Sequence, residues 1–194
     1  MQKYDNLSAK QLPWIKAGYQ LFAIEGPKAL KVEVLARMVG KNKSSFYHHF
    51  ADMEVYTNLL LSYHLERASL VLQQEAACQN VVPELLNVLL EHKEDLLFNR
   101  QLRIHRHISE MAACFAETAE GMGEAIGKIW AQELGLADNS RLALLVLNLS
   151  LENFYLQITE ETLTFDWLEG YVNELRVMVE AFGANERLIK ANER

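Results

Sequence analysis

Three short stretches with apolar residues at helical spacing occupy the first fifty positions of the chain. The first covers residues 11–25 and ends at Gly26-Pro27, the second covers residues 32–39 and ends at Gly40, and the third covers Lys43–Phe50. A longer amphipathic helix followed by two short helices joined through a tight glycine-containing turn is the plan of a helix-turn-helix domain. We therefore expect this fold at the N-terminal end.

Capping residues mark where the predicted helices begin. The side chain of Asn42 can accept a free backbone N–H at the start of the third helix, and Asp52 can do the same for a long helix over Met53–Cys78. Phe46 and Phe50 are expected to point inward as core residues. In the long helix the apolar residues on one side are Val55, Leu59, Tyr63 and Leu70.

Few helix-breaking residues interrupt the rest of the chain, which has three prolines and nine glycines in 194 residues. This low content favours an all-α protein. The expected further helices are about 83–97, 99–118, 120–134, 139–159 and 165–183. The predicted organisation is a helix-turn-helix domain at residues 1–52, which we call the head, and a helical body at residues 53–194.

The charges divide unevenly between these two parts. The head carries eight Lys/Arg against four Asp/Glu, a net charge of +4, whereas the body carries 11 against 22, a net charge of −11. A basic head on an acidic body places the affinity for polyanions at one end of the molecule.

Several classes of protein are disfavoured by absent patterns. Cys78 and Cys114 form no metal or redox motif, so we expect reduced thiols and a cytoplasmic protein. No apolar run reaches the roughly 18–20 residues of a membrane span, and the N-terminus has no apolar region typical of a secretion signal. Zinc-protease, di-iron, nucleophile-elbow and nucleotide-loop motifs are absent as well. We expect no catalytic residues, no metal and no cofactor.

The run Gly40-Lys-Asn-Lys-Ser-Ser-Phe-Tyr-His-His-Phe50 resembles the signature of the TetR family of bacterial regulators, with Gly40 as turn glycine, Asn42 as cap and Tyr47-His48-His49-Phe50 as the Tyr-x-His-Phe element. The resemblance covers about residues 11–60. It implies a DNA-binding head, a body that dimerises and binds a small-molecule effector, and repression as the usual mode of control. Double-stranded operator DNA is the implied partner.

The resemblance also implies which residues meet DNA, because the third helix enters the major groove. Lys43, Ser44 and Ser45 are expected near base edges, Lys41, Tyr47 and His49 near phosphates, and His48 at either. Three positions depart from the family pattern: Lys31 replaces a capping Thr, Glu33 puts a carboxylate on a surface that faces DNA, and Met53 replaces a frequent Lys. Lys31 and Glu33 complete the set of expected DNA-facing residues.

Residues 141–158 and 165–183 are the expected dimer helices, because the first of them is apolar on more than one face. The alternative is a fully buried central helix of a monomer. The middle helices are expected to enclose the effector, with Arg103, His107, Met111, Cys114, Trp130, Asn153 and Tyr155 as candidate pocket residues. The basic run from Phe98 to His107 is either an anion site or a solvated face.

The predicted function is a ligand-responsive transcriptional regulator that binds a palindromic operator as a homodimer. A helical binding or adaptor protein that kept this fold and weakened or lost DNA binding is the alternative, favoured by Glu33 and Met53. An enzyme is a more distant alternative, because no catalytic motif supports it.

Overall fold

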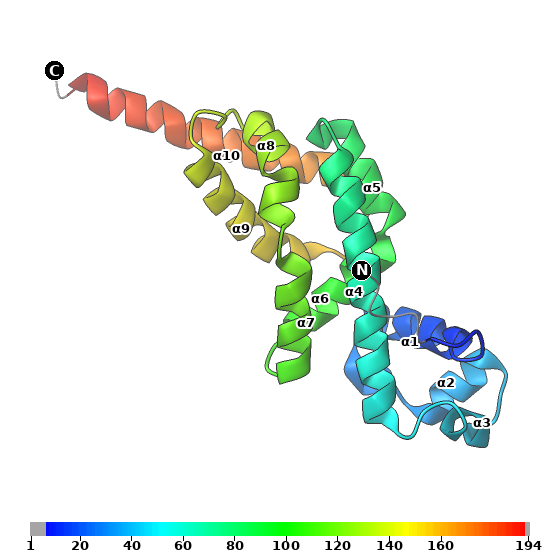
Figure 1. Ribbon diagram of the computed structural model, residues 1–194. Helices are drawn as coiled ribbons and strands as arrows, with labels where there is room; N and C mark the ends of the chain where they lie inside the picture. The colour runs from blue at the N-terminus through cyan, green and yellow to red at the C-terminus, as the bar shows by residue number, and fades with distance from the viewer. Residues whose placement is uncertain (1–6, 193–194) are drawn as a thin grey trace. The chain divides into compact units, whose positions relative to one another are not determined.

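The computed structural model describes residues 7–192, with side chains described up to residue 182, and every regular element in this part is helical (Figure 1). The all-α prediction is therefore confirmed. The elements are α1 (Leu12–Glu25), η1 (Pro27–Ala29), α2 (Val32–Val39), α3 (Lys43–Tyr47), α4 (Met53–Ala77), η2 (Val81–Leu85), α5 (Leu86–Glu91), α6 (Lys93–Ile104), α7 (Ser109–Ala119), α8 (Met122–Glu133), α9 (Ser140–Gln157) and α10 (Phe165–Asn192).

The chain forms two compact units. Unit 1 combines residues up to Val71 with His92–Glu120, and unit 2 combines Leu72–Glu91 with the residues from Gly121 onward. Helix α4 passes from one unit into the other. The predicted functional boundary at residue 52 stays a prediction, because the head shares unit 1 with most of α4 and with α6 and α7, and its first six residues lie outside the described part.

The N-terminal helices begin and end close to where the sequence predicts them. Helices α1 and α2 agree within one residue of the expected ranges. Helix α3 is shorter than the expected Lys43–Phe50, because it ends at Tyr47 and is followed by a turn. His48 caps this end, so Phe50 reaches the core from the turn and not from the helix.

The helices expected at 83–97 and 99–118 have the wrong boundaries. The chain breaks at His92, whose φ of −110° and ψ of 31° are not helical, and α6 then continues to Ile104. The reason is tertiary packing: Phe98, placed at the expected break, is fully buried and its ring stacks on Phe22 of α1 at 4.1 Å between centroids. Phe98 therefore lies inside α6, with its ring packed against α1.

In unit 1, α1 packs on α6, and Tyr56 of α4 reaches α1 at Gly18. A Cβ atom on Gly18 would lie 1.7 Å from the Tyr56 hydroxyl oxygen, so only glycine allows this approach. That hydroxyl donates a hydrogen bond to the carbonyl of Trp14 at 2.8 Å. The side of α4 buried here carries Tyr56 and Leu60, and it is not the side with the exposed residues Val55 and Leu70.

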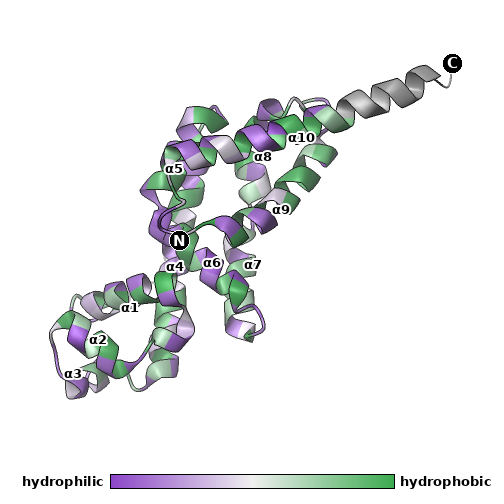
Figure 2. Ribbon diagram, turned by 180° about the vertical axis from the view of Figure 1, so that it is seen from behind, coloured by the Kyte–Doolittle hydropathy of each residue, from purple (hydrophilic) through white to green (hydrophobic). Residues whose placement is uncertain are grey.

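Unit 2 leaves an apolar surface in contact with solvent. Helix α8 packs on α9, and α10 packs on α5. Green, apolar residues follow much of α9 in Figure 2. The large apolar side chains exposed on α9 and α10 are Leu142, Leu144, Leu145, Leu149, Leu156, Val177, Met178 and Phe182. We call this set the α9–α10 apolar surface.

Candidate nucleic-acid interface

The turn between α2 and α3 is closed by backbone geometry. Gly40 has φ 68° and ψ 34°, in the left-handed region that glycine adopts without a steric penalty. The amide of Lys41 then donates to the carbonyl of Ala36 at 2.8 Å, so this carbonyl near the end of α2 has a hydrogen-bond partner. This tight turn sets the angle at which α3 leaves α2.

Helix α3 is anchored in the core by one buried aromatic residue. Phe46 is fully buried, with its ring 5.6 Å from the ring of Trp14 and 5.4 Å from that of Tyr56. The start of the helix is capped as predicted, because the Asn42 side chain accepts from the Ser45 amide at 2.8 Å. A five-residue helix held at its cap and at Phe46 exposes Lys43, Ser44 and Tyr47.

The expected DNA-facing side chains lie on the outer side of the head. The exposed ones are Lys31, Glu33, Lys41, Lys43, Ser44, Tyr47 and His48. Ser45 and His49 are half-buried, and the carbonyl of His49 accepts a hydrogen bond from the Gln11 side chain at 3.0 Å. The resulting surface is small and polar, and it has the donors and acceptors that base edges and phosphates require.

A carboxylate engages the main cation of this surface. Lys43 Nζ lies 2.5 Å from Glu33 Oε1, and both side chains are more than half exposed. The hydrogen bond from Lys43 lowers the pKa of Glu33, so this carboxylate is ionised at neutral pH. Lys31, at the start of α2, makes no side-chain cap, as its departure from the family pattern predicts.

A buried polar cluster fastens the head to the rest of unit 1. The Tyr19 hydroxyl of α1 donates to Asp95 Oδ1 of α6 at 2.5 Å. Arg67 of α4 donates two hydrogen bonds to the same carboxylate, of 2.6 Å and 2.7 Å. His64 Nδ1 lies 2.7 Å from the Tyr19 oxygen. The other ring nitrogen, Nε2, lies 3.1 Å from Asn99 Oδ1, so both nitrogens of the ring have polar neighbours.

The charges of this cluster are set by burial and by pairing. Burial raises the pKa of Asp95, but the hydrogen bonds from Arg67 and Tyr19 outweigh it and hold that pKa below its ordinary value. Burial lowers the pKa of His64 to about 4, so the ring is neutral at pH 7. We find a stable ion pair here, with a neutral histidine beside it.

Sequence reasoning missed the buried polar cluster. Tyr19 lies in the first predicted helix, but its partner Asp95 is 76 positions away. The only signal was indirect, since Asp95, His64 and Arg67 interrupt otherwise apolar helix faces. Such a residue is equally compatible with a solvated position until its neighbours are known.

The candidate pocket residues divide between the units. In unit 1, Met111 and Cys114 are buried, His107 is exposed, and the guanidinium of Arg103 lies 5.9 Å from the centre of the Phe115 ring. In unit 2, Trp130 and Tyr155 are buried, whereas Asn153 is exposed and 3.3 Å from the Tyr171 hydroxyl. Their role in a pocket stays a prediction.

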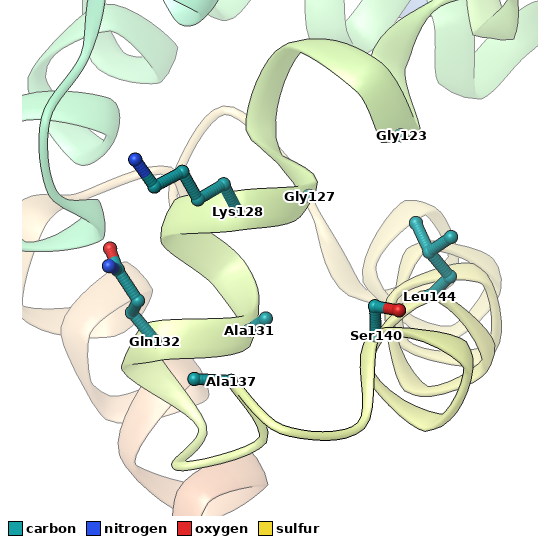
Figure 3. A pocket seen from close by; sticks show the side chains of 8 residues that line it. All are labelled: Gly123, Gly127, Lys128, Ala131, Gln132, Ala137, Ser140 and Leu144. Carbon is teal, nitrogen blue, oxygen red and sulfur yellow. The ribbon is translucent and has the colours of Figure 1, made fainter.

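A groove of about 410 Å³ lies between α8 and α9 in unit 2 (Figure 3). It is lined by Gly123, Gly127, Lys128, Ala131, Gln132, Ala137, Ser140 and Leu144. A Cβ on Gly123 or Gly127 would lie 3.2 or 3.4 Å from Leu144, so the two glycines make room for that side chain. None of the candidate pocket residues lines this groove.

Comparison with known proteins identifies the N-terminal segment. Residues 15–55 match the family model described as "Bacterial regulatory proteins, tetR family", which covers α1 to the start of α4. The match confirms the resemblance predicted from the segment Gly40–Phe50. No curated protein and no solved structure matched the chain. Within residues 7–192, no helix combines the length and apolar character needed to cross a membrane.

Proposed function

We propose that this chain, which carries the DNA-binding domain of the tetR family of bacterial regulatory proteins, is a ligand-responsive repressor of transcription. It binds a palindromic operator as a homodimer in the cytoplasm, and a small-molecule effector in the body changes its affinity for DNA. Helix α3 reads the major groove, and flanking residues of the head hold phosphates.

The observation that carries this proposal is the build of α3. A short helix is fixed at its start by Asn42 and from below by Phe46, and it presents Lys43, Ser44 and Tyr47 to solvent. Rigid placement of a few polar side chains on one face is what sequence readout in a groove requires. Polar side chains that only face water do not need to be held in fixed positions in this way.

Homodimerisation is supported by the α9–α10 apolar surface. Leu149 and Phe182 are 64% and 69% exposed, and they belong to a larger group of exposed apolar side chains on the same two helices. Extended apolar patches of this kind mark protein interfaces. Two heads are needed, because one short helix reads only a few base pairs and paired recognition helices meet successive major grooves ~34 Å apart.

The buried polar cluster supports a route for control. It ties α1 of the head to α4 and α6 through Tyr19, Arg67 and Asp95. Helix α4 continues from unit 1 into unit 2, so an effector that favours one placement of α4 changes the spacing of the two heads. By linkage, effector and DNA then weaken each other's binding by the same factor.

Selection of bound duplexes from a random DNA pool, using the full chain, tests the proposal. We expect enrichment of an inverted repeat, with binding that weakens steeply as salt rises. Lys43→Gln should reduce enrichment, whereas Lys93→Gln, at a half-exposed position at the start of α6, should not. No enriched sequence and no salt-sensitive binding to duplex DNA would exclude the regulator.

A helical binding protein with weakened DNA binding is the second candidate. It is favoured by the Lys43–Glu33 ion pair, which occupies the main cation of α3 with a carboxylate. This candidate predicts a dimer that binds a small molecule or a protein but has the same low affinity for every duplex. The random-pool selection separates the two, since only the regulator enriches a symmetric sequence.

A further inference from the structure

A corner of unit 1 outside the head carries a second group of basic side chains. It connects α6 to α7, and we define the α6–α7 corner as residues 103–107, with Arg103, His105, Arg106 and His107. Ile104, Arg106 and His107 are exposed, whereas His105 is half-buried. The guanidinium of Arg103 instead lies over the ring of Phe115. Arg106 is therefore the cation that this corner presents to solvent.

The corner is anchored directly on the head. Gln101 Nε2 donates to the carbonyl of Ile24, in the last turn of α1, at 3.0 Å. A Cβ on Gly26 would lie 2.9 Å from the His105 ring, so the start of the corner touches the end of α1. His105 Nδ1 is in turn 2.9 Å from the carbonyl of Gln101. These contacts hold the corner in a fixed position relative to the head.

The same contacts bring the corner to a basic stretch of the head. Gly26 is followed within two residues by Lys28 in η1, which is exposed, and then by exposed Lys31 at the start of α2. In Figures 1 and 2 the α6–α7 turn and α3 both lie toward the lower end of unit 1, on opposite sides of the lower part of α4. The corner thus places an exposed arginine outside the helix-turn-helix segment but at the same end of unit 1.

We propose that the α6–α7 corner is a second DNA contact, in which Arg106 binds a backbone phosphate while α3 occupies the major groove. This inference rests on the proposed DNA binding. An exposed arginine at the same end of unit 1 as the recognition helix suits phosphate, because it needs no enclosing pocket and gains affinity through release of counterions. Glu110, in the following turn, accepts a hydrogen bond from the Ser109 hydroxyl, and we assign it no part in the contact.

An anionic effector is the competing partner for these side chains. A small anion held tightly needs several converging donors in a concave site. The exposed, outward turn at Ile104 to His107 is the opposite arrangement, with Arg103 directed toward Phe115. The observations therefore favour an extended polyanion, because each of its anionic groups can bind a single exposed cation.

The test measures how the affinity of the full-length protein for its selected operator depends on salt. We compare wild type with Arg106→Gln, Arg106→Lys and the control Lys93→Gln, whose half-exposed lysine begins α6, at the end of that helix away from the corner. For Arg106→Gln the slope of log affinity against log salt should become shallower by about 1. The affinity loss should be equal for operator and unrelated duplexes, because phosphate contacts carry no sequence information. Arg106→Lys should restore the slope.

Each other outcome has a defined meaning. If Arg106→Gln and wild type have the same slope and affinity, the corner contact is refuted and the proposed function stands. If Arg106→Gln keeps its DNA affinity but no longer responds to an anionic effector, the corner is an anion site and the inference is wrong. If wild type binds no duplex in a salt-dependent manner, the proposed function itself fails and the corner contact fails with it. Circular dichroism and dimer mass of the variants verify that folding is unchanged.

Discussion

Lys43 of α3 forms an ion pair with Glu33 of α2, with 2.5 Å between Nζ and Oε1. The pair joins the two helices of the helix-turn-helix on their solvent side. It also places a negative charge beside the side chain best suited to meet guanine or phosphate. Both residues are exposed, so the pair can open when DNA approaches. The free energy needed to open it reduces the affinity for DNA.

Replacing the carboxylate should therefore strengthen DNA binding. Glu33→Gln leaves Lys43 without its competing anion and removes the repulsion between Glu33 and phosphate. Because exposed ion pairs are weak, the affinity for DNA should rise by only about two- to fivefold. Fluorescence anisotropy with the selected operator measures it at low salt. Glu91→Gln, at an exposed carboxylate in unit 2, is the control. Weaker binding by Glu33→Gln would show that Glu33 reads a base, for example a cytosine amine.

Gly18→Ala should destabilise the head. The added Cβ would lie 1.7 Å from the Tyr56 hydroxyl, and overpacking of this kind costs about 1–3 kcal/mol. Urea denaturation followed by circular dichroism gives the free energy of unfolding. Adding Tyr56→Phe, which deletes the clashing oxygen, should recover part of the loss. Additive effects of the two substitutions would contradict the close packing of α1 against α4.

His64 should make stability fall as the solution becomes acidic. Burial lowers its folded-state pKa to about 4 from an ordinary 6.5, so between these values the unfolded chain binds a proton that the folded chain does not. The stability contributed by the neutral ring is complete above about pH 6.5 and decreases toward pH 4, by an amount on the order of 3 kcal/mol.

The measurement is the free energy of unfolding from pH 7 to pH 4. His64→Gln should be less stable than wild type at pH 7 but should lose less stability on acidification. The exposed His107→Gln should follow the wild-type curve. The carboxylate of Asp95 faces the same ring. Its pKa is lowered by folding, so its contribution to stability is also lost in acid. The free energy of unfolding of His64→Gln therefore still falls to some extent as the pH is lowered. An unchanged slope in that variant would mean that His64 titrates equally in both states.

Glu75 should have the opposite pH dependence. This residue of α4 is buried, and burial raises its pKa to about 7 from an ordinary 4.5. The folded chain therefore holds a proton that the unfolded chain has released, and stability is lost as pH rises from about 4.5 through about 7. Glu75→Gln should raise the melting temperature at pH 8 and have little effect at pH 5. The exposed Glu91→Gln is the control, and a melting temperature lowered at both pH values would contradict the assignment.

Charges on the α9–α10 apolar surface should produce monomers. Leu149→Glu and Phe182→Glu place a carboxylate where the proposed partner subunit buries apolar side chains, which an interface core tolerates poorly. Analytical ultracentrifugation should show half the wild-type mass, and operator affinity should fall with it. Leu70→Glu, at a leucine of α4 that is 58% exposed, should remain dimeric. A dimeric Leu149→Glu would place the interface elsewhere.

Much of the head could be predicted from the sequence because its determinants are local. The turn at Gly40, the caps at Asn42 and Asp52, and the buried Phe46 all depend on residues within a few positions of one another. Backbone hydrogen bonding and the left-handed conformation of glycine act over that range. Local pattern therefore determined the all-α class and the helix-turn-helix, and the match of residues 15–55 agrees with it.

The tertiary structure alone decided which distant side chains meet. The predicted break at Phe98 failed because the ring stacks on Phe22, and burying this aromatic surface outweighs any local preference for a turn. Asp95 finds Tyr19 only after α6 has docked on α1. Lys43 was expected to be an available cation until the angle between α2 and α3 brought Glu33 beside it. Short-range interactions determine the helices, whereas packing and charge pairing between them exist only once the chain has folded.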